Sequence, residues 1–339
     1  MGTDNRGHDG LLPLVESFFR EHLQRVRGAS SSTIASYRDS MRLFLCFLAD
    51  SSSRPVSDLE LDDIMAERVI AFLELLEIER SNSVSTRNLR LAAVRSFVQH
   101  LLRRDPTRAG QYRRILDVPT KRARRPPVTY LEPEQVQALL RQPDQRRPAG
   151  RRDHALLLFL YNTGARVGEA LALRWQEVQL ARPAQVRLHG KGNKDRFCPL
   201  WNETAEALAR LPNASDGRER QLFLNARGEP LTRDGVAYIL RKHASAAARE
   251  RPAIATLHVT PHVLRHSCAV ALLQAGIDIT MIRDYLGHAS IATTSRYIST
   301  NLQMKRDVLD AFWHRAGLAS DSASAWRPAP DVLAFLEQL

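Results

Sequence analysis

The segment VRLHGKGNKDRFCPL, residues 186–200, interrupts an otherwise helical pattern. Val186 and Leu188 alternate with polar residues, a glycine-bearing run follows, and apolar residues resume at Phe197. Two such runs around glycine and asparagine are typical of a β-hairpin. The segment therefore predicts one hairpin, with Lys191 in its turn.

Apolar residues recur at helical spacing on both sides of this hairpin. Helices are predicted to begin near Pro133, about Asp153, Thr232, Thr260, about Ile279 and Ser290. Pro261 suits a first helical position, and Gly276 suits a helix stop. Residues 222–224 are expected to form another short strand.

The first 117 residues read as helices alone. The first helix is expected over Leu11 to Val26, and Ser30 to Thr33 offers caps for the second. Asp62 or Asp63 is expected to start the third, and Ser83 or Ser85 to cap the fourth. The fourth helix is expected to show Arg87, Arg90 and Arg95 on its polar side, which predicts a basic face.

Length and composition divide the chain. A chain of 339 residues exceeds the usual size of one core. In residues 118–128, prolines alternate with basic residues, which predicts an extended, solvated linker. The expected organisation is mainly α with a small β-sheet: a helical domain over 1–117, the linker over 118–128, an α+β domain over 129–317 and a tail over 318–339.

The charge balance points to a polyanion as the partner. Lys and Arg total 49 against 37 Asp and Glu, so the net charge is +12. Such an excess favours nucleic acid or anionic lipid, although an Arg-rich soluble protein is the plain alternative. The basic run of residues 103–125 lacks an apolar face in its last part, so a phosphate-tracking strap fits better than a membrane-surface helix.

The sequence argues against membrane, secreted, zinc-binding and nucleotide-binding proteins. The sequence has no run of about 18 uninterrupted apolar residues, so no membrane span is predicted. Residues 1–10 are too polar for a signal peptide. Cys46, Cys198 and Cys268 lie far apart without ligand spacing, which predicts a reduced cytoplasmic protein with no disulfide and no zinc site. Neither a P-loop nor a dinucleotide fingerprint occurs, so no cofactor is implied.

Several short motifs are weak taken singly. Residues 163–166 read Thr-Gly-Ala-Arg and precede Glu169, which suits any arginine at a helix terminus. His262 and Arg265 are three residues apart, so on a helix their side chains lie on the same face. Tyr297 is one of seven tyrosines, for which a core position is the ordinary explanation.

Their order and spacing together are specific. The carboxy-terminal domain resembles the catalytic domain of the tyrosine recombinase (phage integrase) family, and its Xer-like branch in particular. The amino-terminal half resembles, more loosely, the family's helical SAM-like core-binding domain. The matches are the Thr-Gly-x-Arg turn with Arg166, the hairpin lysine Lys191, the His-x-x-Arg-His box with His262, Arg265 and His266, the Leu-Gly-His box with His288, and Tyr297 nine residues later.

The resemblance implies a role for each matched position. Arg166 and Arg265 would hold the non-bridging oxygens of a DNA phosphate, and His288 would be an accessory donor. His262 would take the proton of Tyr297 as Tyr297 forms a 3′-phosphotyrosine ester, and Lys191 would protonate the departing 5′-oxygen. The ester keeps the bond energy, so no ATP is needed. His266 is expected to have a packing or supporting role.

The resemblance also implies partners. Double-stranded DNA is the expected substrate, with four protomers, identical or related, on two sites and no membrane. The expected DNA contacts are Arg87, Arg90, Arg95, Lys121, Arg122, Arg124, Arg125, Lys194 and Arg196. The apolar stripe of residues 330–339 must dock, either on its own protomer or on a neighbour. A cytoplasmic, nucleoid-associated enzyme is expected, serving a mobile element or resolving chromosomes.

Two other functions stay open on the sequence. A relaxase resembling the type IB topoisomerases would share the chemistry without exchanging partners. A regulator on the same fold would bind DNA without cutting, but binding alone does not require Tyr297.

Overall fold

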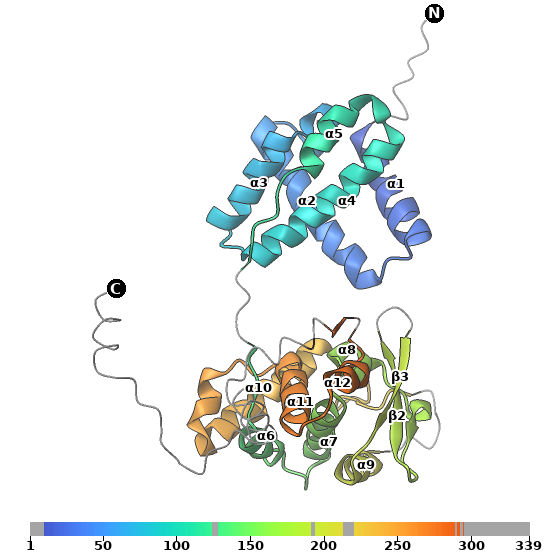
Figure 1. Cartoon of the computed structure of the whole chain (residues 1–339), viewed down its shortest axis with the longest axis vertical. Coiled ribbons are helices and arrows are strands. Elements are labelled where there is room, and N and C mark those ends of the chain that lie inside the picture. The colour runs from blue at the N-terminus through green and yellow to red at the C-terminus, as the bar shows by residue number, and fades with distance from the viewer. Residues whose placement is uncertain are drawn as a thin grey trace, which may run out of the picture. The chain divides into compact units, whose positions relative to one another are not determined.

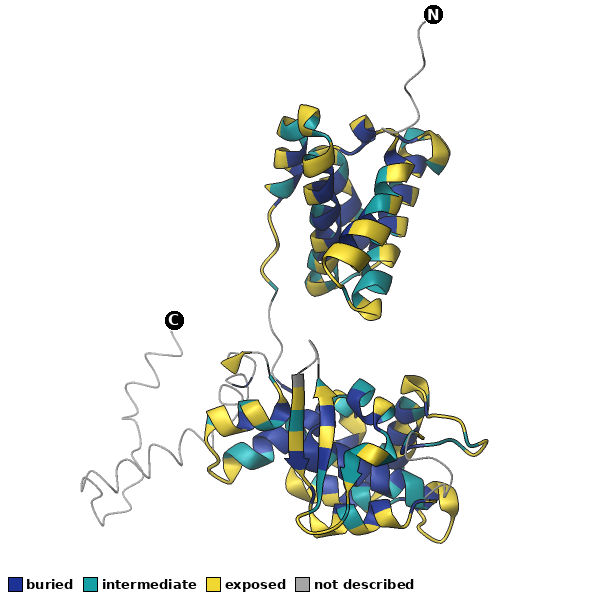
Figure 2. Ribbon diagram, turned by 90° about the vertical axis from the view of Figure 1, so that its right-hand side faces the viewer, coloured by how far each residue is buried: buried dark blue, intermediate teal, exposed yellow. Residues whose placement is uncertain are grey.

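The computed structural model describes residues 10–123, 128–190, 194–212, 220–288, 290, 291 and 294. The chain divides into two compact units, Met1–Arg125 and Pro126–Leu339 (Figure 1). Each unit buries its own apolar residues beneath exposed ones (Figure 2). None of the described helices is long and apolar enough to cross a membrane.

Helices, with no strand, make up the regular structure of the first unit's described residues, as predicted. Its α-helices are α1 (Leu11–Ser17), α2 (Ser31–Ser52), α3 (Ala66–Ile78), α4 (Val84–Arg104) and α5 (Ala109–Leu116). Phe44, Phe72 and Phe97 lie in its core. The side chains of Ser30 and Ser83 accept hydrogen bonds from backbone N–H groups, so both predicted caps are confirmed.

The first helix spans the predicted residues Leu11 to Val26, where α1 continues into a π-helix, η1 (Phe18–Val26). One helix of this unit starts later than predicted. The third begins at Ala66, not at Asp62 or Asp63. Asp63 is instead buried at the end of a 3-10 turn, where its carboxylate pairs with Arg54 and Arg68, so it could not serve as the cap of α3.

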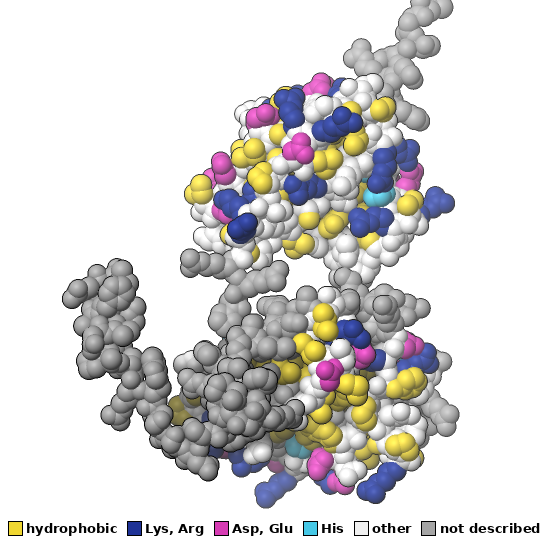
Figure 3. Space-filling model, viewed as in Figure 1, with side chains coloured by type: hydrophobic (Ala, Val, Ile, Leu, Met, Phe, Trp, Pro, Cys, Tyr) yellow, Lys and Arg dark blue, Asp and Glu magenta, His cyan; other side chains and the backbone are white. Residues whose placement is uncertain are grey.

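The basic side of α4 is also wrong as predicted. Arg87 is buried, and Arg90 and Arg95 are half-buried. Arg90 donates to the Ser40 hydroxyl at 2.9 Å, while Arg95 donates to the Val118 carbonyl. These guanidinium groups therefore bond within the unit. On the face of the unit shown in Figure 3, Lys and Arg side chains are interspersed with acidic ones.

The start of the linker is bonded to this unit rather than solvated throughout. Arg87 Nη1 donates to the Pro119 carbonyl at 3.1 Å. The Asn88 side chain donates to the Lys121 carbonyl at 2.8 Å and accepts from the Lys121 N–H at 3.1 Å. Lys121 Nζ pairs with Glu77 at 2.6 Å. Residues 118–121 therefore form a strap along α4, named here the linker strap.

The second unit is mostly helical with one small sheet, as predicted. Its α-helices are α6 (Pro133–Leu140), α7 (Pro148–Thr163), α8 (Val167–Ala172), α9 (Asn202–Ala209), α10 (Arg233–Glu250), α11 (Pro261–Gln274) and α12 (Ile279–Leu286). The predicted starts near Pro133, Thr232, Thr260 and Ile279 are confirmed, as is the stop at Gly276. The helix expected from about Asp153 begins earlier, at Pro148.

The sheet is antiparallel, in the order β1-β2-β3. Strands β2 (Gln185–Gly190) and β3 (Lys194–Pro199) form the predicted hairpin (Figure 1). The third strand is β1 (Val178–Gln179), which was not predicted. Residues 222–224 form no strand, so that prediction is wrong; Gln221 and Leu224 make isolated bridges with Arg174 and Pro230.

Several predicted features lie outside the described residues. They are the hairpin turn 191–193, most of the helix expected from Ser290, Tyr297, the tail, and linker residues 124–127.

Candidate active site at the carboxyl end of helix α12

The turn between α7 and α8 places the first arginine. Gly164 ends α7 with a φ of 56°, the left-handed region that favours glycine. Thr163 Oγ1 donates to the Phe159 carbonyl at 2.7 Å and accepts from the Ala165 N–H at 3.2 Å. Arg166 then caps α8. The turn therefore fixes where the Arg166 side chain leaves the backbone.

Glu169 holds Arg166 at two points. The Arg166 N–H donates to Glu169 Oε2 at 3.0 Å, and Arg166 Nη1 donates to Glu169 Oε1 at 2.7 Å. Arg166 keeps about a third of its side chain exposed, whereas Glu169 is buried. The exposed part of the Arg166 side chain is accessible from the surface.

Helix α11 supplies the second arginine. Pro261 occupies its first turn, so His262, Arg265 and His266 follow within the next turns. The Arg265 side chain is only 3% exposed. Its Nη1 donates to the Gly164 carbonyl, and its Nη2 donates to the Leu286 carbonyl at 2.7 Å. Arg265 thus joins the α7–α8 turn to the end of α12.

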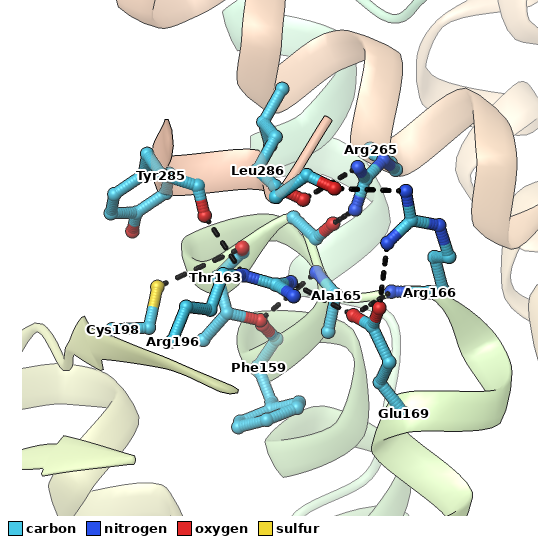
Figure 4. Close-up of polar contacts among 12 residues, drawn as sticks. Phe159, Thr163, Ala165, Arg166, Glu169, Arg196, Cys198, Arg265, Tyr285 and Leu286 are labelled. Atoms are coloured by element: carbon cyan, nitrogen blue, oxygen red, sulfur yellow. Dashed lines mark hydrogen bonds and ion pairs between the residues drawn. The ribbon is translucent and has the colours of Figure 1, made fainter. Parts of the chain in front are cut away.

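Three arginines bind consecutive carbonyls at the end of α12 (Figure 4). These carbonyls have no partners within a helix, because a helix leaves its last C=O groups unpaired. Tyr285 O accepts from Arg196 Nε at 3.0 Å, Leu286 O from Arg265, and Gly287 O from Arg166 Nη2 at 3.1 Å. We call this arrangement the α12 hub. It brings together cations from α8, β3 and α11.

His288 follows the hub directly. Gly287 ends α12 in the left-handed conformation, and the His288 N–H donates to the Arg283 carbonyl at 2.9 Å. His288 Nδ1 lies 2.9 Å from the hydroxyl of the buried Thr294. The helix end and Thr294 therefore set the direction of the imidazole ring.

Both histidines are kept neutral. Burial, with the charges of Arg265 and Arg166, lowers the pKa of His262. Burial, with the same two charges and those of His266 and Arg196, lowers the pKa of His288 to about 4. A neutral imidazole can accept a proton, and it can also donate a hydrogen bond from its other nitrogen.

Glu169 stays ionised beside these cations. Burial alone would raise the pKa of its carboxyl, but hydrogen bonds and charge from Arg196, with hydrogen bonds from Arg166, leave that pKa below its ordinary value. Two arginines next to neutral histidines are suited to an anion that accepts several hydrogen bonds, such as a phosphate.

The structure joins four of the six predicted catalytic residues. Arg166 and Arg265 meet at the α12 hub, where His288 follows, and His262 lies one helical turn before Arg265. Lys191 and Tyr297 lie outside the described residues.

The predicted DNA contacts fall into three groups. Lys121 and Arg122 are exposed. Arg124, Arg125 and the side chain of Lys194 are outside the described residues. Arg87, Arg90, Arg95 and Arg196 donate hydrogen bonds within the protein, and their expected DNA contacts stay predictions.

Sequence reasoning gave no role to Glu169, and it expected Arg196 to face DNA or solvent, whereas this side chain donates to Glu169 and to the Tyr285 carbonyl. Glu169 is the third residue of α8 and accepts from the Arg166 N–H, but arginine is not one of the usual N-cap residues, so the sequence does not mark this pair. Nothing in the sequence says that Arg196 contacts the end of α12, because 89 positions separate the two.

Comparison with known proteins identifies the family. Residues 129–320, more than half of the chain, match the family model described as the phage integrase family. The chain belongs to the phage integrase family. Residues 16–105 also match the SAM-like N-terminal domain of the phage integrases. Tyrosine recombinases of this family cleave and rejoin DNA through a covalent tyrosine intermediate, so the chain is an enzyme of that kind.

Relatives match nearly the whole chain. A putative integrase/recombinase, y4rC, of Sinorhizobium fredii is 39% identical over 98% of this chain and 99% of its own length. The tyrosine recombinase XerC of Pelobacter propionicus is 33% identical over 88% of this chain and 96% of its own. The phage integrase match therefore extends to Xer recombinases.

Solved structures of recombinases share the fold. The XerH site-specific recombinase, bound to a palindromic difH substrate after cleavage, has a TM-score of 0.65 at 22% identity, over 87% of this chain and 84% of that one. The Tn1549 transposon integrase with a circular intermediate DNA also has a TM-score of 0.65, at 16% identity, over 87% and 98%.

Proposed function

We propose that Tyr297 of this phage integrase relative attacks a phosphodiester of double-stranded DNA held by Arg166 and Arg265. The observation that carries the proposal is the α12 hub, which fixes both guanidinium groups on consecutive carbonyls beside His288. A phosphate at this place would meet cations whose positions are set before it arrives. Such preorganisation is the main source of electrostatic catalysis.

The proposed reaction exchanges one ester for another. The Tyr297 phenolic oxygen forms a bond to phosphorus while the bond from phosphorus to the 5′-oxygen breaks. His262, which is neutral at pH 7, takes the phenol proton, and Lys191 gives a proton to the departing oxygen. The phosphotyrosine ester left on the 3′ end is then attacked by a 5′-hydroxyl, which restores the DNA strand and the phenol.

Charge at phosphorus is the main barrier to this exchange. The five-coordinate centre carries more negative charge on its non-bridging oxygens than the starting diester. A well-placed donor to a developing oxyanion contributes about 3–4 kcal/mol in measured systems. Arg166 and Arg265 would supply such donors, and His288 a further one, because the neutral ring still carries an N–H.

Covalent trapping tests the proposal. Purified protein is incubated with fragments of the source genome, and DNA that stays bound in detergent is sequenced. The wild type is expected to give a defined site, and peptide mapping is expected to find the linkage on Tyr297. Tyr297→Phe should trap nothing, because it lacks the attacking oxygen, whereas Tyr238→Phe, an exposed tyrosine on α10, should trap as the wild type does.

Covalent complex formed by Tyr297→Phe at the wild-type level would contradict the proposed attack. Relaxation of supercoiled plasmids with no recombinant product from a substrate carrying two sites would contradict strand exchange and indicate a relaxase, which shares the chemistry.

The proposed biological setting is strand exchange by several protomers, this chain or a related recombinase, on two DNA sites. The exposed Lys121 and Arg122 are the proposed phosphate contacts of the linker, with Arg124, Arg125 and Lys194. The relative y4rC, whose printed name is putative integrase/recombinase, supports integration by a mobile element, and the XerC relatives support resolution. The trapped site distinguishes these roles by its genomic position.

A further inference from the structure

Arg196 lies on β3, on the side of the hairpin that faces the α12 hub (Figure 4). From its contacts we infer that Arg196 is a positioning residue for DNA cleavage, holding Glu169 and the end of α12 so that Arg166 and His288 keep their places. The inference rests on the proposed function, because it assigns a residue that supports that reaction.

The first contact acts on Arg166. Arg196 Nη2 donates to Glu169 Oε2 at 2.8 Å, the same oxygen that accepts from the Arg166 N–H at 3.0 Å. The other carboxylate oxygen, Oε1, accepts from Arg166 Nη1. Glu169 is thus a bridge between two arginines, and its orientation depends on both. Without Arg196, one side of this bridge is lost.

The second contact acts on α12. Arg196 Nε donates to the Tyr285 carbonyl at 3.0 Å, three residues before His288. The guanidinium also packs against Gly287, where a side-chain Cβ would lie 3.0 Å from Arg196 Nη1. Because glycine has no Cβ, the end of α12 can lie this close to the Arg196 guanidinium. The arginine fixes the helix end from which His288 projects.

The Arg196 side chain is held by partners inside the catalytic unit. The Arg196 side chain is 10% exposed, and its Nε and Nη2 atoms donate to partners in the protein. On the same hairpin, Arg187 is about half exposed and pairs with Asp195. The two arginines therefore provide a matched pair, one inside the catalytic unit and one on its surface.

The chemistry of Glu169 gives the inference a specific readout. The Glu169 side chain is 5% exposed, and this burial acts to raise the pKa of its carboxyl. Once the Arg196 charge is removed, Arg166 alone is left to lower that pKa. The pKa of Glu169 then rises, and at lower pH the neutral acid holds Arg166 less well. Cleavage by such a variant should fall with decreasing pH through an additional limb, beside the one that protonation of His262 gives to the wild type and the variant alike.

Single-turnover cleavage of a nicked duplex carrying the trapped site tests this. At saturating protein and pH 8, Arg196→Met is expected to cleave about 100-fold more slowly than the wild type, the order of loss found when a reacting group is misplaced by about 1 Å. Arg196→Lys should fall between them, because a lysine lacks the fork that reaches both acceptors. Arg187→Met should cleave at the wild-type rate.

The pH profile separates positioning from a general loss of structure. Arg196→Met should show the extra acid limb, and the double variant Arg196→Met/Glu169→Gln should lack it, because glutamine does not titrate. Affinity for the duplex, and its salt dependence, should stay as in the wild type. If Arg196→Met unfolds, Arg196→Gln and the double variant Arg196→Gln/Glu169→Gln carry the same comparison, because glutamine also removes the charge.

Two results would overturn the inference. One is a cleavage rate of bound Arg196→Met within two-fold of the wild type. The other is weaker binding with a smaller salt dependence and an unchanged rate in the bound complex, which would make Arg196 a phosphate contact. If the wild type itself forms no covalent complex, the proposed function fails instead.

Discussion

At the scale of single residues, Gly164 shows how tightly the site is packed. Its carbonyl accepts from Arg265, and a Cβ at this position would lie 2.4 Å from Leu286 Cδ2. Its φ of 56° is costly for any residue with a side chain. The glycine therefore allows α7, α11 and α12 to meet at one point.

Gly164→Ala is expected to lower both stability and cleavage. The left-handed backbone costs about 1–2 kcal/mol for alanine, and overpacking adds about 1–3 kcal/mol. Pushing Leu286 away also moves the carbonyl that holds Arg265, so cleavage should fall even where the variant is folded. Thermal unfolding and single-turnover cleavage measure the two effects.

Gly110→Ala is the control for Gly164→Ala. Gly110 lies in α5 with open space around its Cβ position, so alanine should be neutral or stabilising there. Equal unfolding temperatures for the two variants would contradict the role given to Gly164.

At the scale of elements, the linker strap is a short segment fixed by side chains rather than by a helix or a sheet. Arg95 donates to the Val118 carbonyl and Arg87 to the Pro119 carbonyl. The Asn88 side chain bonds to the N–H and the carbonyl of Lys121. The strap therefore sets the place where the chain leaves the first unit. Arg87 and Arg95 serve this purpose instead of forming a basic face.

Asn88→Ala is expected to loosen the strap. The change removes the two hydrogen bonds to Lys121 and a third from Arg87 Nη1. Losing about 1 kcal/mol of local stability corresponds to a roughly five-fold larger open population. Limited trypsin digestion should therefore cut after Lys121 or Arg122 about five-fold faster. Gln99→Ala, an exposed position on the same helix, should leave the cutting rate unchanged. Equal rates for the two variants would show that Asn88 does not hold the strap.

At the scale of the whole molecule, the chain combines two units, each with its own apolar core, with an excess of positive charge. Each unit buries its own apolar cluster, and the chain carries a net charge of +12. The charge favours binding of duplex DNA and makes that binding dependent on salt. The apolar stripe of Val332, Phe335, Leu336 and Leu339 adds a segment too short to be a stable helix alone.

Deletion of residues 328–339 is expected to weaken cooperative assembly. If the stripe docks on a neighbouring protomer, the deletion should reduce cooperativity on a duplex with two adjacent half-sites and spare binding to one. Gel-shift titrations of both duplexes measure this. Glu337→Gln, which leaves the apolar stripe intact, is the control. Unchanged cooperativity after the deletion would show docking in cis or none.

Most of the fold could be predicted from local sequence. The caps Ser30, Ser83 and Thr232 and the stop at Gly276 act through bonds within a few residues, so they can be read directly. The two-residue alternation of the hairpin is local as well. The wrong predictions depend on contacts between distant residues. The Asp63 carboxylate pairs with Arg54 and Arg68 instead of starting a helix, and residues 222–224 have no partner strand.

The sequence by itself determined the helical domain, the hairpin, and the order of the residues that match the phage integrase family, because spacing along the chain carries that information. Only the tertiary structure decided which cations face outward. Arg87 and Arg196 read as DNA contacts, yet both bond to groups far away in the sequence. The physical reason is that a guanidinium binds whichever acceptor lies within reach, and the folding of distant segments brings the carbonyls of α12 and of the linker strap there.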